Sequence, residues 1–176
     1  VSAADISNRQ GAMRGDAITL TAGTRIDNNA GLISATNSAS LTDANPVSRA
    51  LVIDNSNGTV IAGQQTSVLA YSFTGSGRFL SQKDLRIDLV APILHTGQIG
   101  ASGDIDLRTA GTFTNAGAVG AGGTLMLTAA TIDNQASGSL VGNTLKLKAT
   151  DVHTFINRGL IDGVNTVIES STVNNI

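Results

Sequence analysis

The chain has 176 residues with a formal net charge of -2, and Gly, Ser, Thr and Asn contribute 20, 16, 20 and 14 of them. So much Gly and Asn excludes an α-helical bundle, and a hydrophobic content of 41% at low net charge excludes a disordered chain. With 3% aromatic residues and no basic excess, nucleic acid is not an expected partner.

A short motif of an apolar residue, a spacer and Asn recurs from one end of the chain to the other. In chain order, the predicted repeat starts are Ile6, Ile26, Ile53, Phe73, Ile93, Phe113, Ile132, Phe155 and Val173. The steps cluster near 20 residues, with one step of 27 between Ile26 and Ile53. Two copies are degenerate, because Gly75 and His95 stand where the others have Asn. Such a period indicates one supersecondary unit that stacks on copies of itself.

Two further apolar segments follow most starts. The later one alternates between apolar and polar residues, which indicates a half-buried strand. Its copies lie at residues 18–21, 85–88, 105–108, 125–128, 145–148 and 167–169. Shorter apolar segments between the start and this strand lie at residues 32–33, 60–61, 79–80, 99, 119, 140–141 and 160–161. Each unit therefore contains about three very short strands.

These units predict a right-handed parallel β-helix (β-solenoid) of about eight rungs. Strands of three to five residues are not stable alone, but stacked units pair each strand with its counterpart in the next unit. The right-handed form is the usual one for parallel connections. A β-sandwich was the alternative, but its strands would not recur in one pattern every 20 residues. Residues 1–176 are thus predicted to be a single β-helix segment of a larger protein.

A column of Asn residues is predicted at one corner of the rod. Its members are Asn8, Asn28, Asn55, Asn115, Asn134, Asn157 and Asn175. Asn suits corners because it tolerates the left-handed conformation and bonds local backbone, and stacked amides can bond one another along the rod. The Gly that follows is expected to supply a positive φ, and His95 is expected to substitute for Asn in the column.

The predicted register places charged side chains of neighbouring rungs over one another. Arg86 lies over Asp106 and Asp88 over Arg108, so that both pairs have opposite charges. The neighbouring pair, Asp84 over Asp104, has like charges and goes against this pattern.

Carboxylates on an outer face raise the alternative of a carbohydrate-active enzyme, since some parallel β-helices cleave glycans. Asp104 and Asp106 share one side of a strand, roughly 7 Å apart, which is within reach of an acid/base pair, and Asp84 lies beside them. Their Arg neighbours favour a salt-bridge lattice, so we expect no enzyme activity. His95 and His153 are far apart and there is no Cys, so neither a metal nor a cofactor is expected.

The long step predicts a surface insertion at about residues 36–52. Insertions in solenoids form loops that often lie on a binding face, and interfaces favour Tyr and Arg. The predicted partner contacts are Pro46, Arg49, Tyr71 and Arg78. The alternative is that the loop has no binding role and that the aromatic residues nearby belong to the core.

Three segments resemble the filamentous-haemagglutinin repeats of two-partner-secreted exoproteins. They read IDNNAGLISA at residues 26–35, FTNAGAVGAGGTLMLTAATIDNQASGSL at 113–140 and FINRGLIDG at 155–163. That family includes haemagglutinin adhesins and CdiA-like effectors of contact-dependent growth inhibition.

The resemblance implies a non-enzymatic filament segment, secreted to the bacterial cell surface by an outer-membrane transporter of the two-partner type. It also implies a target-cell receptor or glycan as a partner, either for an adhesin or for a receptor-binding module of a growth-inhibition effector. No apolar run approaches the roughly 20 residues of a transmembrane helix, so no membrane span is expected.

Overall fold

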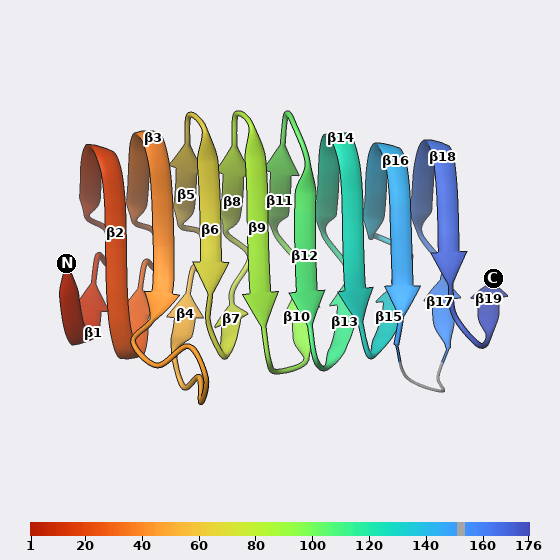
Figure 1. The fold of residues 1–176 in the computed structure, drawn as a ribbon, viewed down its shortest axis with the longest axis horizontal. Coiled ribbons are helices and arrows are strands. Elements are labelled where there is room, and N and C mark those ends of the chain that lie inside the picture. The colour runs from red at the N-terminus through yellow and green to blue at the C-terminus, as the bar shows by residue number, and fades with distance from the viewer. Residues whose placement is uncertain (151–153) are drawn as a thin grey trace.

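Parallel strands build a rod in which each turn of the chain contributes to three faces. The computed structural model describes residues 1–150 and 154–176, and within them it shows an all-β parallel β-solenoid of about nine turns without a helix. Successive turns follow one another along the long axis, with the two termini at opposite ends (Figure 1). The predicted fold class is confirmed, with about nine turns in place of about eight.

Three faces account for all the strands of the described residues. The first face contains β5 (Thr59–Ala62), β8 (Arg78–Ser81) and β11 (Gln98–Ala101), and the second contains β6 (Gln65–Leu69), β9 (Asp84–Leu89) and β12 (Ile105–Thr109). Longer strands cross from the first face to the second: β2 (Ala12–Asp27), β3 (Leu32–Asp43), β14 (Ala118–Ala129), β16 (Ser139–Ala149) and β18 (Leu160–Glu169). The third face contains β1 (Ser2–Ser7), β4 (Val52–Asp54), β7 (Ser72–Thr74), β10 (Ile93–His95), β13 (Thr112–Asn115), β15 (Thr131–Asn134), β17 (Phe155–Asn157) and β19 (Val173–Asn175), and β2 reaches it at its end.

The predicted repeat starts lie side by side on the third face. Ile6, Ile26, Ile53 and Phe73 pair in sequence, as do Ile93, Phe113, Ile132, Phe155 and Val173. The step from Phe73 to Ile93 alone has no ladder in the described part of the chain, since the 14-stranded sheet ends at β7 and the five-stranded sheet begins at β10.

Charged pairs follow the predicted register, although their closest contacts run along the strands. Arg86 pairs with Asp106, and Asp88 with Arg108. The ion pairs, however, join Arg108 Nε to Asp106 Oδ1 at 2.8 Å and Arg86 Nη2 to Asp88 Oδ2 at 3.8 Å. Two residues along a strand point to the same side, so both kinds of neighbour lie within reach of a long Arg side chain.

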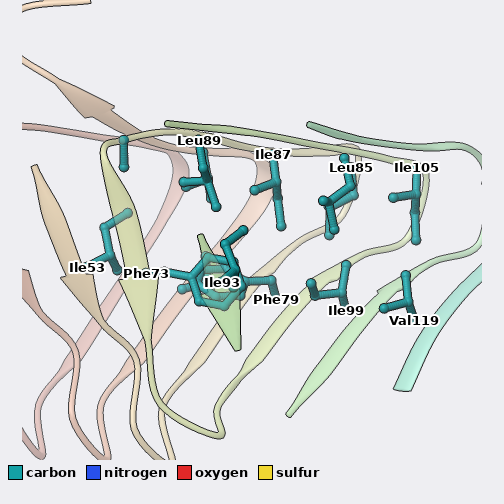
Figure 2. Packing of buried hydrophobic residues seen from close by; sticks show 14 of the residues in the cluster. Ile53, Phe73, Phe79, Leu85, Ile87, Leu89, Ile93, Ile99, Ile105 and Val119 are labelled. Atoms are coloured by element: carbon teal, nitrogen blue, oxygen red, sulfur yellow. The ribbon is translucent and has the colours of Figure 1, made fainter. Parts of the chain in front are cut away.

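Apolar side chains fill the narrow interior (the lumen) of the rod. Along most strands every second residue turns inward, and most of these inward residues are aliphatic or Phe, with Thr66, Ser81 and Thr109 among the polar exceptions. Leu85, Ile87 and Leu89 of β9 face Phe73, Phe79 and neighbouring residues across the lumen (Figure 2). Burial of this surface, at about 25 cal/mol per Å², stabilises turns that would be unstable singly.

The expected role of the corner Gly residues is wrong. Positive φ angles of 53°, 52° and 54° occur at the residues that precede Gly, which are Gln10, Ala30 and Asn57. Gly31 instead has no room for a side chain, because an added Cβ would collide with the carbonyl oxygen of Asn8. Gly75, in the column position itself, does have a positive φ, of 98°. Gly is therefore required at this corner mainly because adjacent turns approach so closely that no Cβ fits.

Truncation of a lumen side chain is predicted to destabilise the rod. Leu147→Ala should lower the free energy of unfolding by about 2–5 kcal/mol, because Leu147 is 1% exposed and packs in register with Leu127 and Ile168. Lys146→Ala on the same strand is the control, since Lys146 faces solvent. Chemical denaturation measures both, and equal effects would contradict the assigned faces.

Candidate interaction surface

The insertion leaves the rod between β3 and β4, beyond the corner between the second and third faces (Figure 1). It begins later than predicted, because residues 36–43 belong to β3. Ala39 and Leu41 there are buried and pair with both neighbouring turns, so this part continues the regular turn. The extra residues are 44–50, which have no counterpart between β6 and β7. We call residues 44–50 the insertion loop.

A buried carboxylate closes the insertion loop. Asp43 is 3% exposed, and its Oδ2 accepts N–H bonds of 2.6 Å from both Ala50 and Leu51. Its Oδ1 accepts the N–H of Asn45 at 2.8 Å. Burial opposes ionisation, but these donors and the charge of Arg49 outweigh it and hold the pKa of Asp43 below its usual value. Sequence reasoning missed Asp43, whose only signal was its place at the last regular position before the insertion.

The predicted contact Arg49 lies at the base of the loop and is bonded within the protein. Its Nη1 donates to Asp88 Oδ1 at 2.7 Å and to the Asp88 carbonyl at 3.1 Å. Its side chain is 16% exposed. Asn45 Oδ1 accepts the N–H groups of Val47 and Ser48, at 3.1 Å each. Pro46 and Val47 are therefore presented to solvent at the tip of an ordered loop.

Exposed apolar side chains gather beside this loop. Outside the first and last turns, the large exposed apolar residues of the described chain are Val47, Tyr71, Val90 and Leu94, with Val47 93% and Leu94 61% exposed. Tyr71 N–H bonds the Leu51 carbonyl and Val90 N–H bonds the Tyr71 carbonyl, so these connections stack turn on turn. A shallow hollow adjoins them, lined by Ser72, Phe73, Thr74, Gly75, Ala91, Pro92, Leu94 and Thr96.

The four predicted partner contacts do not form one cluster. Pro46 and Tyr71 are exposed at the same corner, and Arg49 anchors the loop there. Arg78 is exposed at the start of β8, after the next corner, and its Nε donates to Gln98 Oε1 at 3.1 Å. Phe73 and Phe79 are buried lumen residues whose ring centroids lie 5.1 Å apart.

The predicted Asn column forms two runs of hydrogen-bonded amides. Each Nδ2 donates to the Oδ1 of the next member, and the distances lie between 2.7 and 2.8 Å. One run joins Asn8, Asn28 and Asn55, and the other joins Asn115, Asn134, Asn157 and Asn175. The column residues are buried except Asn175 in the last turn, and their mutual bonds satisfy amides that would otherwise be costly to bury.

His95 occupies the gap between the two runs. It is 1% exposed, and its Nε2 donates to the Ala118 carbonyl at 3.2 Å, as Asn115 Nδ2 does to the Ser139 carbonyl. Its ring lies 6.3 Å from the rings of both Phe73 and Phe113, and its Nδ1 is buried without a partner in the described structure. Burial lowers the pKa of His95 despite the bond to Ala118. The other His, His153, lies outside the described residues.

The carboxylates of the enzyme alternative have structural partners. Asp84 Oδ1 accepts the N–H of Asp104 at 3.0 Å, and Asp104 Oδ1 accepts that of Thr124 at 2.7 Å. These bonds explain how like charges stack at this corner. Asp106 pairs with Arg108. The arrangement favours a role in the lattice over acid/base chemistry.

No group of three or more His, Cys, Asp or Glu side chains that could hold a metal occurs in residues 1–150 and 154–176. Over the same residues, the structure contains no helix with the length and hydrophobicity to cross a membrane.

The fold defines the chain as a parallel β-solenoid, and an insertion loop extends from it between β3 and β4. No family model, curated protein or solved structure gives a significant match to the chain. The resemblance to filamentous-haemagglutinin repeats therefore remains a prediction from the sequence motifs.

The Asp43 clamp predicts a pH-dependent contribution to stability. Asp43→Asn should lower the free energy of unfolding at pH 7 by about 1–3 kcal/mol, because an amide NH₂ would face backbone donors. The depressed pKa means that the carboxylate stabilises the fold above the ordinary value of 3.8 and loses this contribution as pH falls through its folded-state pKa. Denaturation at pH 7 and pH 3 should show a smaller deficit at pH 3 than at pH 7. The exposed Asp162→Asn is the control and should change stability little at either pH.

His95 predicts a second pH dependence. Its lowered pKa means that the unfolded chain binds a proton more readily, so stability should fall as pH drops below the ordinary value of 6.5. His95→Asn keeps a donor for the Ala118 carbonyl and removes the titration, so its profile between pH 8 and pH 5 should be flatter. Both proteins contain His153, and the difference between the thermal-melt profiles therefore isolates His95. Identical slopes would contradict this prediction.

Proposed function

We propose that the chain is a non-enzymatic β-helical filament segment of a secreted bacterial surface exoprotein, which holds other parts of that protein at a distance and takes part in adhesion or effector presentation. The observation that supports this role is the repetition of one turn in register along the rod, with hydrogen-bonded Asn side chains stacked at one corner. Rigidity and reach are what such a ladder supplies.

The resemblance to filamentous-haemagglutinin repeats supplies the setting of this proposal. It implies export through an outer-membrane transporter of the two-partner type and display at the bacterial cell surface. Each turn buries a few side chains and pairs only with its neighbours. The chain can therefore fold turn by turn as it emerges from the transporter.

Deletion of a whole turn tests the filament role. Removal of residues 98–117 would bring Ala118 to the register position of Gln98 and keep every face in phase. Surface display and adhesion of bacteria that produce the full-length protein should then stay near wild type. Removal of residues 98–107 only would put the following turns out of phase, and display should be lost.

The same deletion separates a filament from an enzyme, because it removes Asp104 and Asp106. Loss of function with correct display after the whole-turn deletion would contradict a modular filament and favour a specific site in this turn.

A receptor-binding module is the second candidate, supported by the insertion loop and the exposed apolar residues beside it. Its partner would be a protein or glycan of the target cell. Deletion of residues 44–50 makes this turn equal in length to its neighbours. Binding of the purified chain to target cells should fall at least tenfold if the loop makes the contact. Unchanged binding would remove the loop from consideration, and Lys146→Ala, at an exposed residue outside the predicted contacts, is the control.

A further inference from the structure

One junction between turns lacks the bonds that join all the others on the third face. β7 and β10 belong to successive turns, yet within the described residues they share no ladder, and each ends its sheet. We call this junction the seam. On the other two faces the same turns remain paired, through Phe79 with Ile99 and Val68 with Ile87.

Local sequence explains why the ladder fails at the seam. Pro92 stands at the register position of Thr112 and Thr131 and has no N–H to donate. Gly75 and His95 replace Asn on the two sides of the seam, so the amide column is also interrupted there. The hollow described above lies directly over the seam, lined by residues of both strands. Between β7 and β10 the backbone ladder and the amide column are therefore both absent. The backbone bonds that remain between these turns on this face lie at its corners, such as those from the N–H groups of Val90 and Ala91 to the Tyr71 carbonyl.

The bond from Arg49 to Asp88 crosses the seam on the outside of the rod. Arg49 lies in the connection that leads into β4, on one side of the seam. Asp88 lies near the end of β9, and the chain continues from it into β10 on the other side. The two residues are 39 positions apart, or about two turns, so that the contact spans about 10 Å of the rod axis. Its distance of 2.7 Å and its second bond to the Asp88 carbonyl make it a charge-assisted anchor.

We propose that the insertion loop is a strap that holds the seam closed, and that the rod opens at the seam when the contact between Arg49 and Asp88 is released. The paired first and second faces act as the hinge. Opening breaks no strand pairing on the third face. Its main costs are the exposure of Phe73, Ile93 and His95 and the loss of the bonds from Val90 N–H and Ala91 N–H to the Tyr71 carbonyl. The apolar residues beside the hollow would then be continuous with the opened lumen.

Thiol labelling in this Cys-free chain tests the proposal. Ile93→Cys reports on the seam, because Ile93 is 3% exposed and borders it. Ile132→Cys is the matched reporter at the same register position in a fully paired turn, where Ile132 is 0% exposed. The labelling rate of a buried thiol follows the equilibrium for local opening. The seam reporter should therefore react faster than the matched reporter.

Arg49→Ala should raise the labelling rate of the Ile93→Cys reporter about fivefold and leave the Ile132→Cys reporter unchanged. Arg9→Ala is the control, since it removes an ion pair, with Asp27, that lies away from both the seam and Asp88. Deletion of residues 44–50 removes the strap independently and should act as Arg49→Ala does. Circular dichroism of each variant establishes that the fold is kept.

Two outcomes would overturn the proposal. An unchanged rate at the seam reporter after Arg49→Ala would show that the contact does not restrain opening. Equal acceleration at both reporters would show general loosening of the rod and no localised opening. Salt at 1 M should accelerate the seam reporter in the chain with Arg49 more than in the Arg49→Ala variant, because it screens the partly exposed pair.

Discussion

The turn-to-turn ladder of parallel backbone hydrogen bonds is the constraint on which the rest of this protein depends. Each strand has only three to six residues on a given face, so its bonds and its buried side chains must both come from the neighbouring turns. A ladder of this kind requires the same phase in every turn, because a shift of one residue would turn the apolar side chains outward. The near-constant spacing of about 20 residues, the alternation along the strands and the position of the insertion at a corner all follow from it.

The corner that carries Asn shows how the same constraint treats polar groups. At this corner neighbouring turns pack closely, so that side-chain amides and backbone carbonyls are shielded from water. The Asn side chains bond one another and also donate to these carbonyls. The bonds run in one direction along the rod, from each Nδ2 to the next Oδ1. His95 keeps the bond to the carbonyl but not the link to the next amide, and Phe73 and Phe113 pack against its ring.

The departures from regularity lie together. The insertion loop, the exposed Tyr71, Val90 and Leu94, the hollow and the seam all occur in consecutive turns around one edge of the third face. The loop is held at its base by Asp43 and Arg49 and presents Pro46 and Val47 at its tip. We infer that the regular turns supply length and stiffness, whereas this edge is where the filament is adapted for contact and movement.

The sequence alone predicted the period, the phase of the strands and the members of the Asn column, because residues that pair in a stacked repeat are one period apart in the sequence. Ile6 predicted its neighbour Ile26 in this way, and Arg86 predicted Asp106. The backbone conformation of the corner could not be predicted from the sequence. The positive φ angles occur at Gln10, Ala30 and Asn57, and Gly31 is required because the Asn8 carbonyl of another turn leaves no room for a Cβ.

The partners of Arg49 and Asp43 were likewise decided only by the folded chain. Their bonds join groups that have no fixed spacing in the sequence: Arg49 reaches across two turns, and Asp43 collects donors from both ends of the insertion loop. Such contacts depend on how an irregular loop lies against a regular rod. A periodic pattern contains no information on that arrangement, because the period is interrupted at the loop.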